Sequence, residues 1–117
     1  MNAQETIITV TADTDQVTLV NVFTVTPPRQ DDLVAALEKG VAEFFQSVPG
    51  FISATLHASL DGTRVINYAQ WSSEQAFQDA MRRPEIQAYI ATTAKLAENW
   101  DPTLTRVLSI HHHQPKA

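Results

Sequence analysis

Two alternating stretches around a tight turn constrain the fold of this chain most. Residues 51–60 and 63–71 carry mainly apolar side chains at every second position, and Asp61 and Gly62 lie between them. A period of two predicts half-buried β-strands, and an Asp-Gly pair between such strands is a strong signal for a hairpin turn. The sequence therefore predicts an antiparallel hairpin over residues 51–71.

The hairpin turn also predicts which side chains face each other across the two strands. The expected pairs are Leu56 with Asn67, Ala54 with Ala69 and Ile52 with Trp71. The alanines are small, so we expect a hollow between Asn67 and Trp71. Trp71 would form a wall of this hollow and offer one indole N–H donor.

Each of two strands carries a single asparagine in an otherwise apolar row. One row belongs to residues 65–71 and contains Asn67, and the other belongs to a predicted strand at residues 17–25 and contains Asn21. A buried amide without a hydrogen-bond partner is costly. Either the protein satisfies these amides internally or they face a ligand, and two lone amides in one hollow favour a ligand site.

The order of predicted elements indicates the topology. A helix with an apolar stripe is expected at 30–47. The capping-box pattern Ser72-Ser73-Glu74-Gln75 predicts a short helix after Ser72. A second long helix is expected at 84–99, and a last strand at 103–112. The order β-α-β-β-α-β predicts an α+β ferredoxin-like fold, with a four-stranded antiparallel sheet and the helices on one face. The first and third strands are then central neighbours, and Asn21 and Asn67 both face the helices.

The second face of this sheet is half apolar and has no helix to cover it. It carries Val20, Val22, His57, Ile66, Tyr68 and Gln70. A face of this kind predicts a homodimer. The expected organisation is an N-terminal arm at 1–16, one domain at 17–112 and a polar tail at 113–117.

Composition excludes several classes of function. The net charge of −5 argues against nucleic acid and anionic membranes as partners, and the lack of cysteine excludes thiolate metal sites and thiol catalysis. Residues 1–15 lack the order of a signal peptide, so we expect a cytoplasmic protein. We expect no metal site and no cofactor, and we interpret the run His111–His113 as a solvated tail.

Several motifs are similar to those of the antibiotic-biosynthesis monooxygenase (ABM) family, and most to its small anthrone oxygenases. The motifs are Val48-Pro49-Gly50-Phe51-Ile52-Ser53-Ala54-Thr55, His57-Ala58-Ser59, Asp61-Gly62-Thr63, Asn67-Tyr68-Ala69-Gln70-Trp71 and Ser73-Glu74-Gln75-Ala76. The resemblance implies a dimeric ferredoxin-like protein that oxidises an anthrone-like aromatic polyketide to a quinone with O₂, without a cofactor.

The resemblance also implies roles for particular residues. Asn67, Trp71 and Asn21 match the family's catalytic positions, where the amides would bond the substrate oxygen that gains charge. The side chains expected to bind the substrate are Phe23, Leu56, Ala69, Phe77 and Ile90.

The chain departs from the actinorhodin-type members of this family at two places. Phe77 stands where they carry a tyrosine, and Ile90-Ala91 stands where they carry an arginine. The haem-degrading branch needs a tryptophan and a histidine where this chain has Ala80 and Ile90, so haem degradation is not expected. The alternative function is a non-catalytic or stress-associated dimer that binds a small molecule on the same fold. A flat, mostly apolar cavity large enough for three fused rings, with Asn67 on its wall, would favour the enzyme, and a filled layer with Asn67 bonded only to protein would favour the alternative.

Overall fold

The computed structural model describes residues 6–116, so residues 1–5 of the predicted arm and residue 117 of the predicted tail lie outside it. The elements follow the order β1 (Val17–Thr24), η1 (Pro27–Arg29), α1 (Gln30–Gly40), η2 (Val41–Phe45), β2 (Phe51–Ala58), β3 (Arg64–Trp71), α2 (Glu74–Met81), α3 (Pro84–Ala94) and β4 (Asn99–Thr105). The predicted α+β fold class is confirmed.

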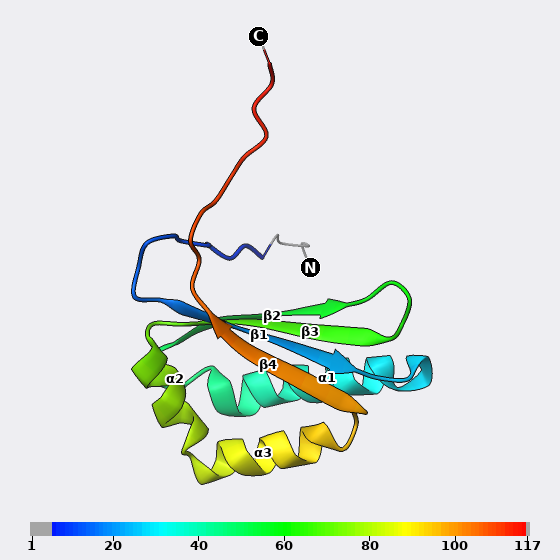
Figure 1. Cartoon of the computed structure of the whole chain (residues 1–117). Coiled ribbons are helices and arrows are strands. Elements are labelled where there is room, and N and C mark those ends of the chain that lie inside the picture. Colours follow the sequence, from blue (N-terminus) through cyan, green and yellow to red (C-terminus); the bar gives the residue numbers. More distant parts are fainter. Residues whose placement is uncertain (1–5, 117) are drawn as a thin grey trace, which may run out of the picture.

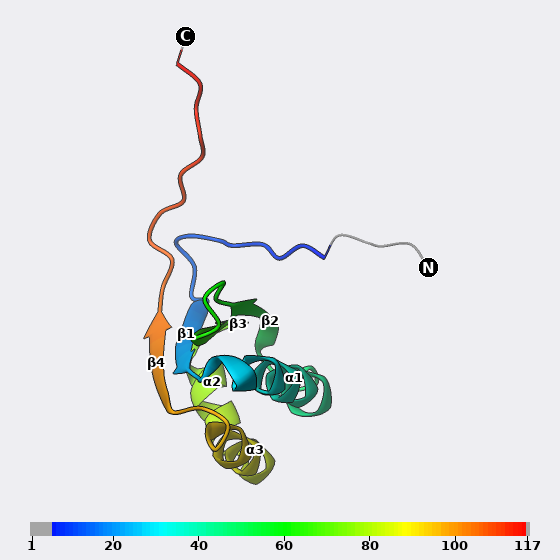
Figure 2. The same ribbon diagram turned by 90° about the vertical axis from the view of Figure 1, so that its right-hand side faces the viewer.

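The four strands form one antiparallel sheet in the order β2-β3-β1-β4. The helices lie on one face of this sheet, with α1 and α3 side by side (Figures 1 and 2). β1 and β3 are the central neighbours, and their register pairs Asn21 directly with Asn67. The sequence-based placement of these asparagines on adjacent strands is therefore confirmed.

The hairpin between β2 and β3 has most of the predicted register. Leu56 lies opposite Asn67, and Ala54 lies opposite Ala69. The predicted pairing of Ile52 with Trp71 is wrong, because an irregularity between Phe51 and Ser53 places Phe51 opposite Trp71. A β-bulge adds a residue and reverses the alternation before it. Phe51 therefore packs against Trp71, and Ile52 is 44% exposed.

The first long helix changes its winding partway along. α1 buries Leu33 and Leu37, and a π-helical stretch, η2, continues it through Phe45. Gly40 stands at the junction, where a Cβ would overlap the ring of Tyr89 from α3. The missing side chain at Gly40 thus lets α1 and α3 approach each other.

The second helical region is divided in two, as expected from Arg83-Pro84. Ser73, and not Ser72, caps α2: its hydroxyl accepts a hydrogen bond of 3.1 Å from the backbone N–H of Ala76. The predicted start of this helix was therefore early by one residue. An N-cap hydroxyl satisfies one of the free N–H groups in the first turn.

The last strand begins earlier than predicted. β4 is Asn99–Thr105 and contains Pro102, and α3 ends at Ala94, so the predicted bounds of the strand (103–112) and of the helix (84–99) are wrong. Proline is tolerated here because β4 is an edge strand and pairs only with β1. The backbone N–H of Glu98 donates to the carbonyl of Thr24 at 2.8 Å, and the ladder begins beyond it.

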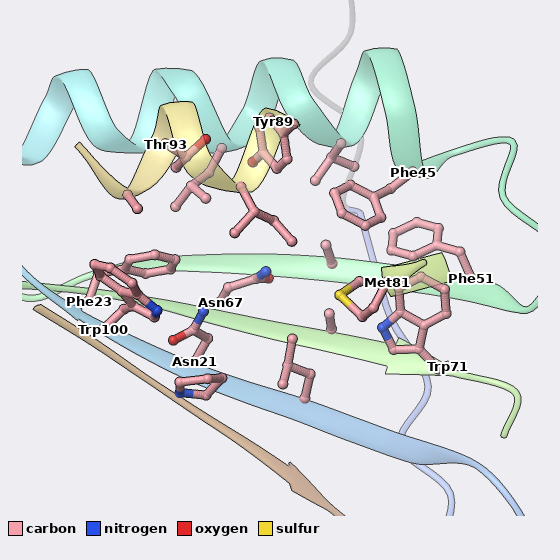
Figure 3. A pocket seen from close by; sticks show the side chains of 18 residues that line it. Asn21, Phe23, Phe45, Phe51, Asn67, Trp71, Met81, Tyr89, Thr93 and Trp100 are labelled. Carbon is pink, nitrogen blue, oxygen red and sulfur yellow. The ribbon is translucent and has the colours of Figure 1, made fainter. Parts of the chain in front are cut away.

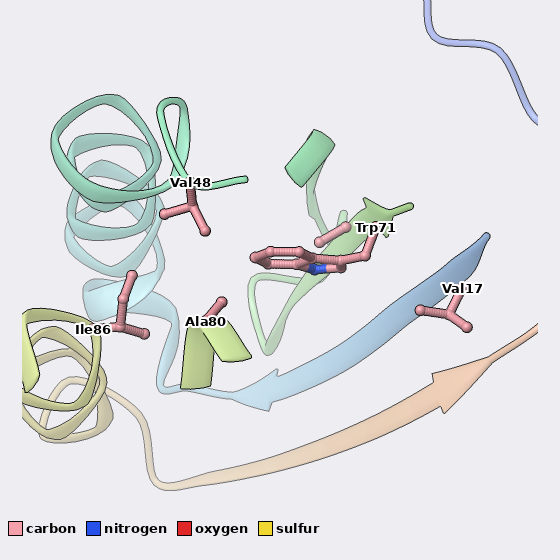
Figure 4. Packing of buried hydrophobic residues seen from close by; sticks show 6 residues of the cluster. Val17, Val48, Trp71, Ala80 and Ile86 are labelled. Carbon is pink, nitrogen blue, oxygen red and sulfur yellow. The ribbon is translucent and has the colours of Figure 1, made fainter. Parts of the chain in front are cut away.

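The apolar interior consists of two clusters between sheet and helices. One surrounds Trp71 and includes Val17, Val48, Ala80 and Ile86 (Figure 4). The other is formed by Phe23, Val25, Leu33, Leu37 and Val65. These clusters anchor the two ends of the sheet.

The N-terminal segment crosses the sheet face opposite the helices (Figures 1 and 2). Gln70, which is 3% exposed, donates from its side-chain nitrogen to the carbonyl of Thr9 at 2.8 Å. The same side chain accepts a hydrogen bond of 2.6 Å from Ser53. The described part of the arm therefore covers some of the face that the sequence left open.

Candidate functional site

A cavity of about 160 Å³ lies between the sheet and the helices (Figure 3). Leu19, Asn21 and Phe23 of β1 and Asn67, Ala69 and Trp71 of β3 form its floor. These side chains share one face because they alternate along their strands. Ala54 of β2 also contributes, so the small residues predicted to leave a hollow do line the cavity.

Three polar atoms on this floor are buried and have no hydrogen-bond partner among residues 6–116. They are Oδ1 of Asn21, Oδ1 of Asn67 and Nε1 of Trp71. An unsatisfied buried group costs about 1–3 kcal/mol. All three belong to cavity-lining residues, so a ligand or water in the cavity would offset that cost.

The two asparagines sit as a direct cross-strand pair. The Cα atoms of such a pair are about 4.5–5.5 Å apart, and the hydrogen-bonded ladder between β1 and β3 holds them there. Each amide carries a carbonyl acceptor and an NH₂ donor, and a half-turn about the last side-chain torsion exchanges the positions of these two groups. The pair can therefore bond one ligand oxygen from two neighbouring positions.

Trp71 closes one end of the cavity and is 1% exposed. Its ring makes edge-to-face contacts with Phe45, Phe51 and Phe77, with centroids 6.1, 5.4 and 5.7 Å away. Figure 3 shows its indole nitrogen on the side of Met81 and the cavity. Aromatic packing on several sides fixes the direction of this donor.

The helices supply the roof. Leu37, Val41 and Phe45 come from the first helical region, and Tyr89, Ile90, Thr93 and Ala94 come from α3. Burial raises the pKa of Tyr89, and a hydrogen bond with Thr93 opposes that shift only in part. Tyr89 is therefore neutral at physiological pH and cannot act as a base there.

The cavity opens between α3 and β4. Ile90 and Trp100 line it and are nevertheless 40% and 45% exposed. Both are apolar, so the opening presents a hydrophobic rim to solvent.

The structure brings together most of the residues that the sequence singled out. Asn21, Asn67, Trp71, Phe23, Ala69 and Ile90 line the cavity. Leu56 and Phe77 lie outside it: Leu56 packs in the cluster around Phe23 and Val65, and Phe77 packs on Trp71 from outside the cavity.

Other lining residues were not identified from the sequence as site residues. They include Phe45, Phe51, Met81, Tyr89, Thr93 and Trp100. The apolar stripe of the first helix contained Phe45, but a stripe alone does not separate core from cavity wall. Trp100 lies just past the predicted helix at 84–99 and was given no role, and the bulge that turns Phe51 inward leaves no clear sequence signal.

No group of three or more histidine, aspartate or glutamate side chains within residues 6–116 is arranged to hold a metal ion. Over the same residues, every helix is too short or too polar to span a bilayer.

The sequence of the chain matches known proteins over most of its length. The profile of the family described as antibiotic biosynthesis monooxygenase matches residues 16–92. Tetracenomycin-F1 monooxygenase of Streptomyces glaucescens is 42% identical over 81 residues, which cover 69% of this chain and 72% of that protein.

Solved structures agree with this relationship. A monooxygenase from the gene ActVA-Orf6 of Streptomyces coelicolor, in complex with nanaomycin D, is 32% identical with a TM-score of 0.72, covering 86% of this chain and 94% of that one. A mutant of SnoaB, a cofactor-independent oxygenase from Streptomyces nogalater, is 26% identical to this chain with a TM-score of 0.69. The match covers 87% of this chain and 99% of that one.

Proposed function

Because the chain belongs to the antibiotic biosynthesis monooxygenase family, we propose that it is a cofactor-independent monooxygenase that oxidises an anthrone-like aromatic polyketide to a quinone with O₂. The observation that carries this proposal is the set of three unpartnered polar atoms, on Asn21, Asn67 and Trp71, in a cavity with mainly apolar walls. Such a cavity suits a flat aromatic molecule with few polar substituents.

The proposed reaction needs no electron donor other than the substrate. A CH₂ group between two aromatic rings loses a proton and becomes a resonance-stabilised carbanion, whose charge is shared with a ring oxygen. The carbanion passes one electron to O₂, and the two radicals combine to a peroxide. The peroxide collapses to a carbonyl group and water, so one oxygen atom enters the quinone and the other leaves as water.

The protein's part in this reaction is to bind the substrate, exclude water and stabilise the anion. Asn21 and Asn67 would donate from their NH₂ groups to the oxygen that gains negative charge, after a half-turn of each amide places Nδ2 where the unpartnered Oδ1 lies. Trp71 would bond the bound O₂ or the peroxide through its indole N–H. An oriented donor in a water-excluded site lowers a barrier by about 2.7–4 kcal/mol.

We infer the proton's destination from the residues that line the cavity. The lining residues within the described chain include no carboxylate and no imidazole. Tyr89 is the one lining residue with a perturbed pKa, and the shift is upward. In this proposal the proton leaves to water at the opening, once the asparagine pair has made the CH₂ group more acidic.

The test is O₂ consumption by chelator-treated protein with a panel of anthrones. We expect Asn67→Ala and Trp71→Phe each to lower kcat by about 10²–10³-fold, because each removes one oriented donor. Trp71→Phe keeps a six-membered aromatic ring and removes the five-membered ring that carries the indole N–H. Asn99→Ala, at an exposed asparagine of β4, is the matched control and should keep wild-type activity.

Two results would contradict the proposal. Full activity in both site variants would show that these residues are not catalytic. Tight binding of anthrones by the wild-type protein without O₂ uptake would favour the alternative, a binding protein without turnover.

We further propose that the protein is a homodimer joined through the sheet face opposite the helices. Val20, Val22, Ile66 and Tyr68 are only half-buried there. The chain beyond β4 also leaves the domain with Leu108 and Ile110 exposed (Figure 1). A second copy would bury these apolar groups.

A further inference from the structure

Trp100 is an exposed tryptophan whose ring has no aromatic partner in the part of the chain that the structure describes. It lines the cavity but is 45% exposed, and it belongs to neither hydrophobic cluster. Among residues 6–116 it takes part in no ring–ring contact, whereas Trp71 takes part in three. Part of the Trp100 side chain is therefore accessible to a ligand at the opening of the cavity.

The register of β4 places Trp100 close to the asparagine pair. Trp100 lies opposite Phe23, and Pro102 lies opposite Asn21. Trp100 is thus a diagonal neighbour of Asn21 on the same face, a relation that long and aromatic side chains can bridge. Figure 3 shows Trp100 beside Phe23 and Asn21, at the end of the cavity away from Trp71.

The size of the cavity is the second observation. Its volume of about 160 Å³ is close to that of an engineered apolar cavity of about 150 Å³ that holds one benzene ring. A molecule with several fused rings cannot be enclosed in that space. Its remaining rings would lie at the opening, which Ile90 and Trp100 border.

We propose that Trp100 is a specificity-determining residue whose indole face stacks on the outer ring of a polycyclic aromatic ligand, while an inner ring lies against Asn21 and Asn67. This inference rests on the proposed function for the class of ligand. In this proposal the opening of the cavity distinguishes ligands by their number of rings, and the residues of the cavity floor act on the reacting ring.

The first test is binding of probes with one and three rings, phenol and 1,8-dihydroxyanthraquinone, to wild-type protein and to Trp100→Ala. We expect the variant to bind the three-ring probe about two- to tenfold more weakly, the range expected for one lost aromatic stack, and to bind phenol unchanged. Trp100→Phe should recover most of the lost affinity. Leu60→Ala, at a fully exposed residue of the turn between β2 and β3, is the control and should change neither affinity.

The second test observes the indole directly. The chain has two tryptophans, so a ¹H–¹⁵N spectrum contains two indole N–H signals, and Trp100→Phe identifies which belongs to Trp100. The three-ring probe should shift the Trp100 signal more than phenol does, because only the larger probe has an outer ring to stack on this indole. The shifts themselves are read in the wild-type protein, and the Trp100→Phe variant serves only to assign the two signals.

The outcomes separate this inference from the proposed function. Equal loss of phenol and three-ring affinity in Trp100→Ala, or no loss of either, overturns the role of Trp100, and the O₂-uptake assay still decides the function. Selective loss of three-ring affinity without O₂ uptake by the wild type supports the role of Trp100 and overturns the monooxygenase proposal. A wild-type protein that binds neither probe overturns the inference.

Discussion

Asp61 organises the turn between β2 and β3 through its carboxylate. It accepts hydrogen bonds from the hydroxyl and backbone N–H of Thr63, at 2.7 and 3.0 Å, and from the hydroxyl of Ser59, at 2.8 Å. These bonds, led by the Thr63 hydroxyl, lower its pKa from 3.8 to about 2. Gly62 follows with φ of +80°, a conformation that glycine adopts without strain.

The lowered pKa of Asp61 predicts a pH-dependent contribution to stability. A carboxyl group with a depressed pKa in the folded protein stabilises it above the unfolded pKa of 3.8. That contribution is lost as the pH falls through about 2. We expect Asp61→Asn to be less stable than wild type at pH 6, and the difference to disappear between about pH 4 and pH 2. Urea unfolding across this range measures it, and a difference that grows on acidification would contradict it.

Single residues also show what sequence patterns can and cannot predict. Asn21 and Asn67 were found because each interrupts an apolar row of period two, and the topology then placed them side by side. Phe51 and Ile52 exchanged their predicted orientations because a bulge adds a residue without changing the apolar character of the strand.

At the level of elements, Gly40 and Tyr89 control the approach of α1 and α3. The ring of Tyr89 occupies the space where a side chain at position 40 would lie. It also packs against Phe44 and Phe45, with centroids 5.6 and 5.7 Å away. The height of the cavity roof therefore depends on this contact.

Gly40→Ala should destabilise the protein, although alanine favours helix by about 1 kcal/mol over glycine. The new methyl group must displace the Tyr89 ring, and overpacking of this kind costs about 1–3 kcal/mol. In a Tyr89→Ala background the same substitution should instead be neutral or stabilising. Thermal or urea unfolding of the four proteins in this cycle tests the contact, and additive effects would refute it.

The elements differ in how well their sequences predict them. The hairpin and the first helix have strong periodic patterns and turn residues, and they were predicted within a few residues. β4 was misplaced because Pro102 reads as a breaker, whereas an edge strand tolerates proline and pairing with β1 begins before it. Partner strands far along the chain, not local propensity, decide that boundary.

On the scale of the whole molecule, the two faces of the sheet are covered differently. One carries the helices and the cavity, and the other carries the described part of the N-terminal arm, joined by the hydrogen bond from Gln70 to Thr9. The sequence predicted that no helix covers this second face. The N-terminal arm is polar and has no clear periodic pattern, so its sequence did not indicate that it would cross the sheet there.

The proposed homodimer predicts a mass in solution of twice the chain's 13.0 kDa. Ile66→Asp, in the middle of the open face, should convert it to monomer because a buried charge without a partner is costly at an interface. Leu60→Asp, at a fully exposed turn residue, is the control and should remain dimeric. Light scattering measures both, and a monomeric wild type would contradict the prediction.

The direct pairing of Asn21 with Asn67 has a consequence for how such a protein could be modified. Their spacing is set by the ladder between the two central strands, while the shape above them is set by side chains from helices, such as Met81 and Ile90. The polar pair and the enclosing surface thus come from separate parts of the chain. Substitutions in the helices could reshape the site for a different ligand while the amides keep their relative positions. The asparagine pair therefore keeps a fixed geometry beneath helix side chains that can be changed separately, which is useful for engineering new selectivity.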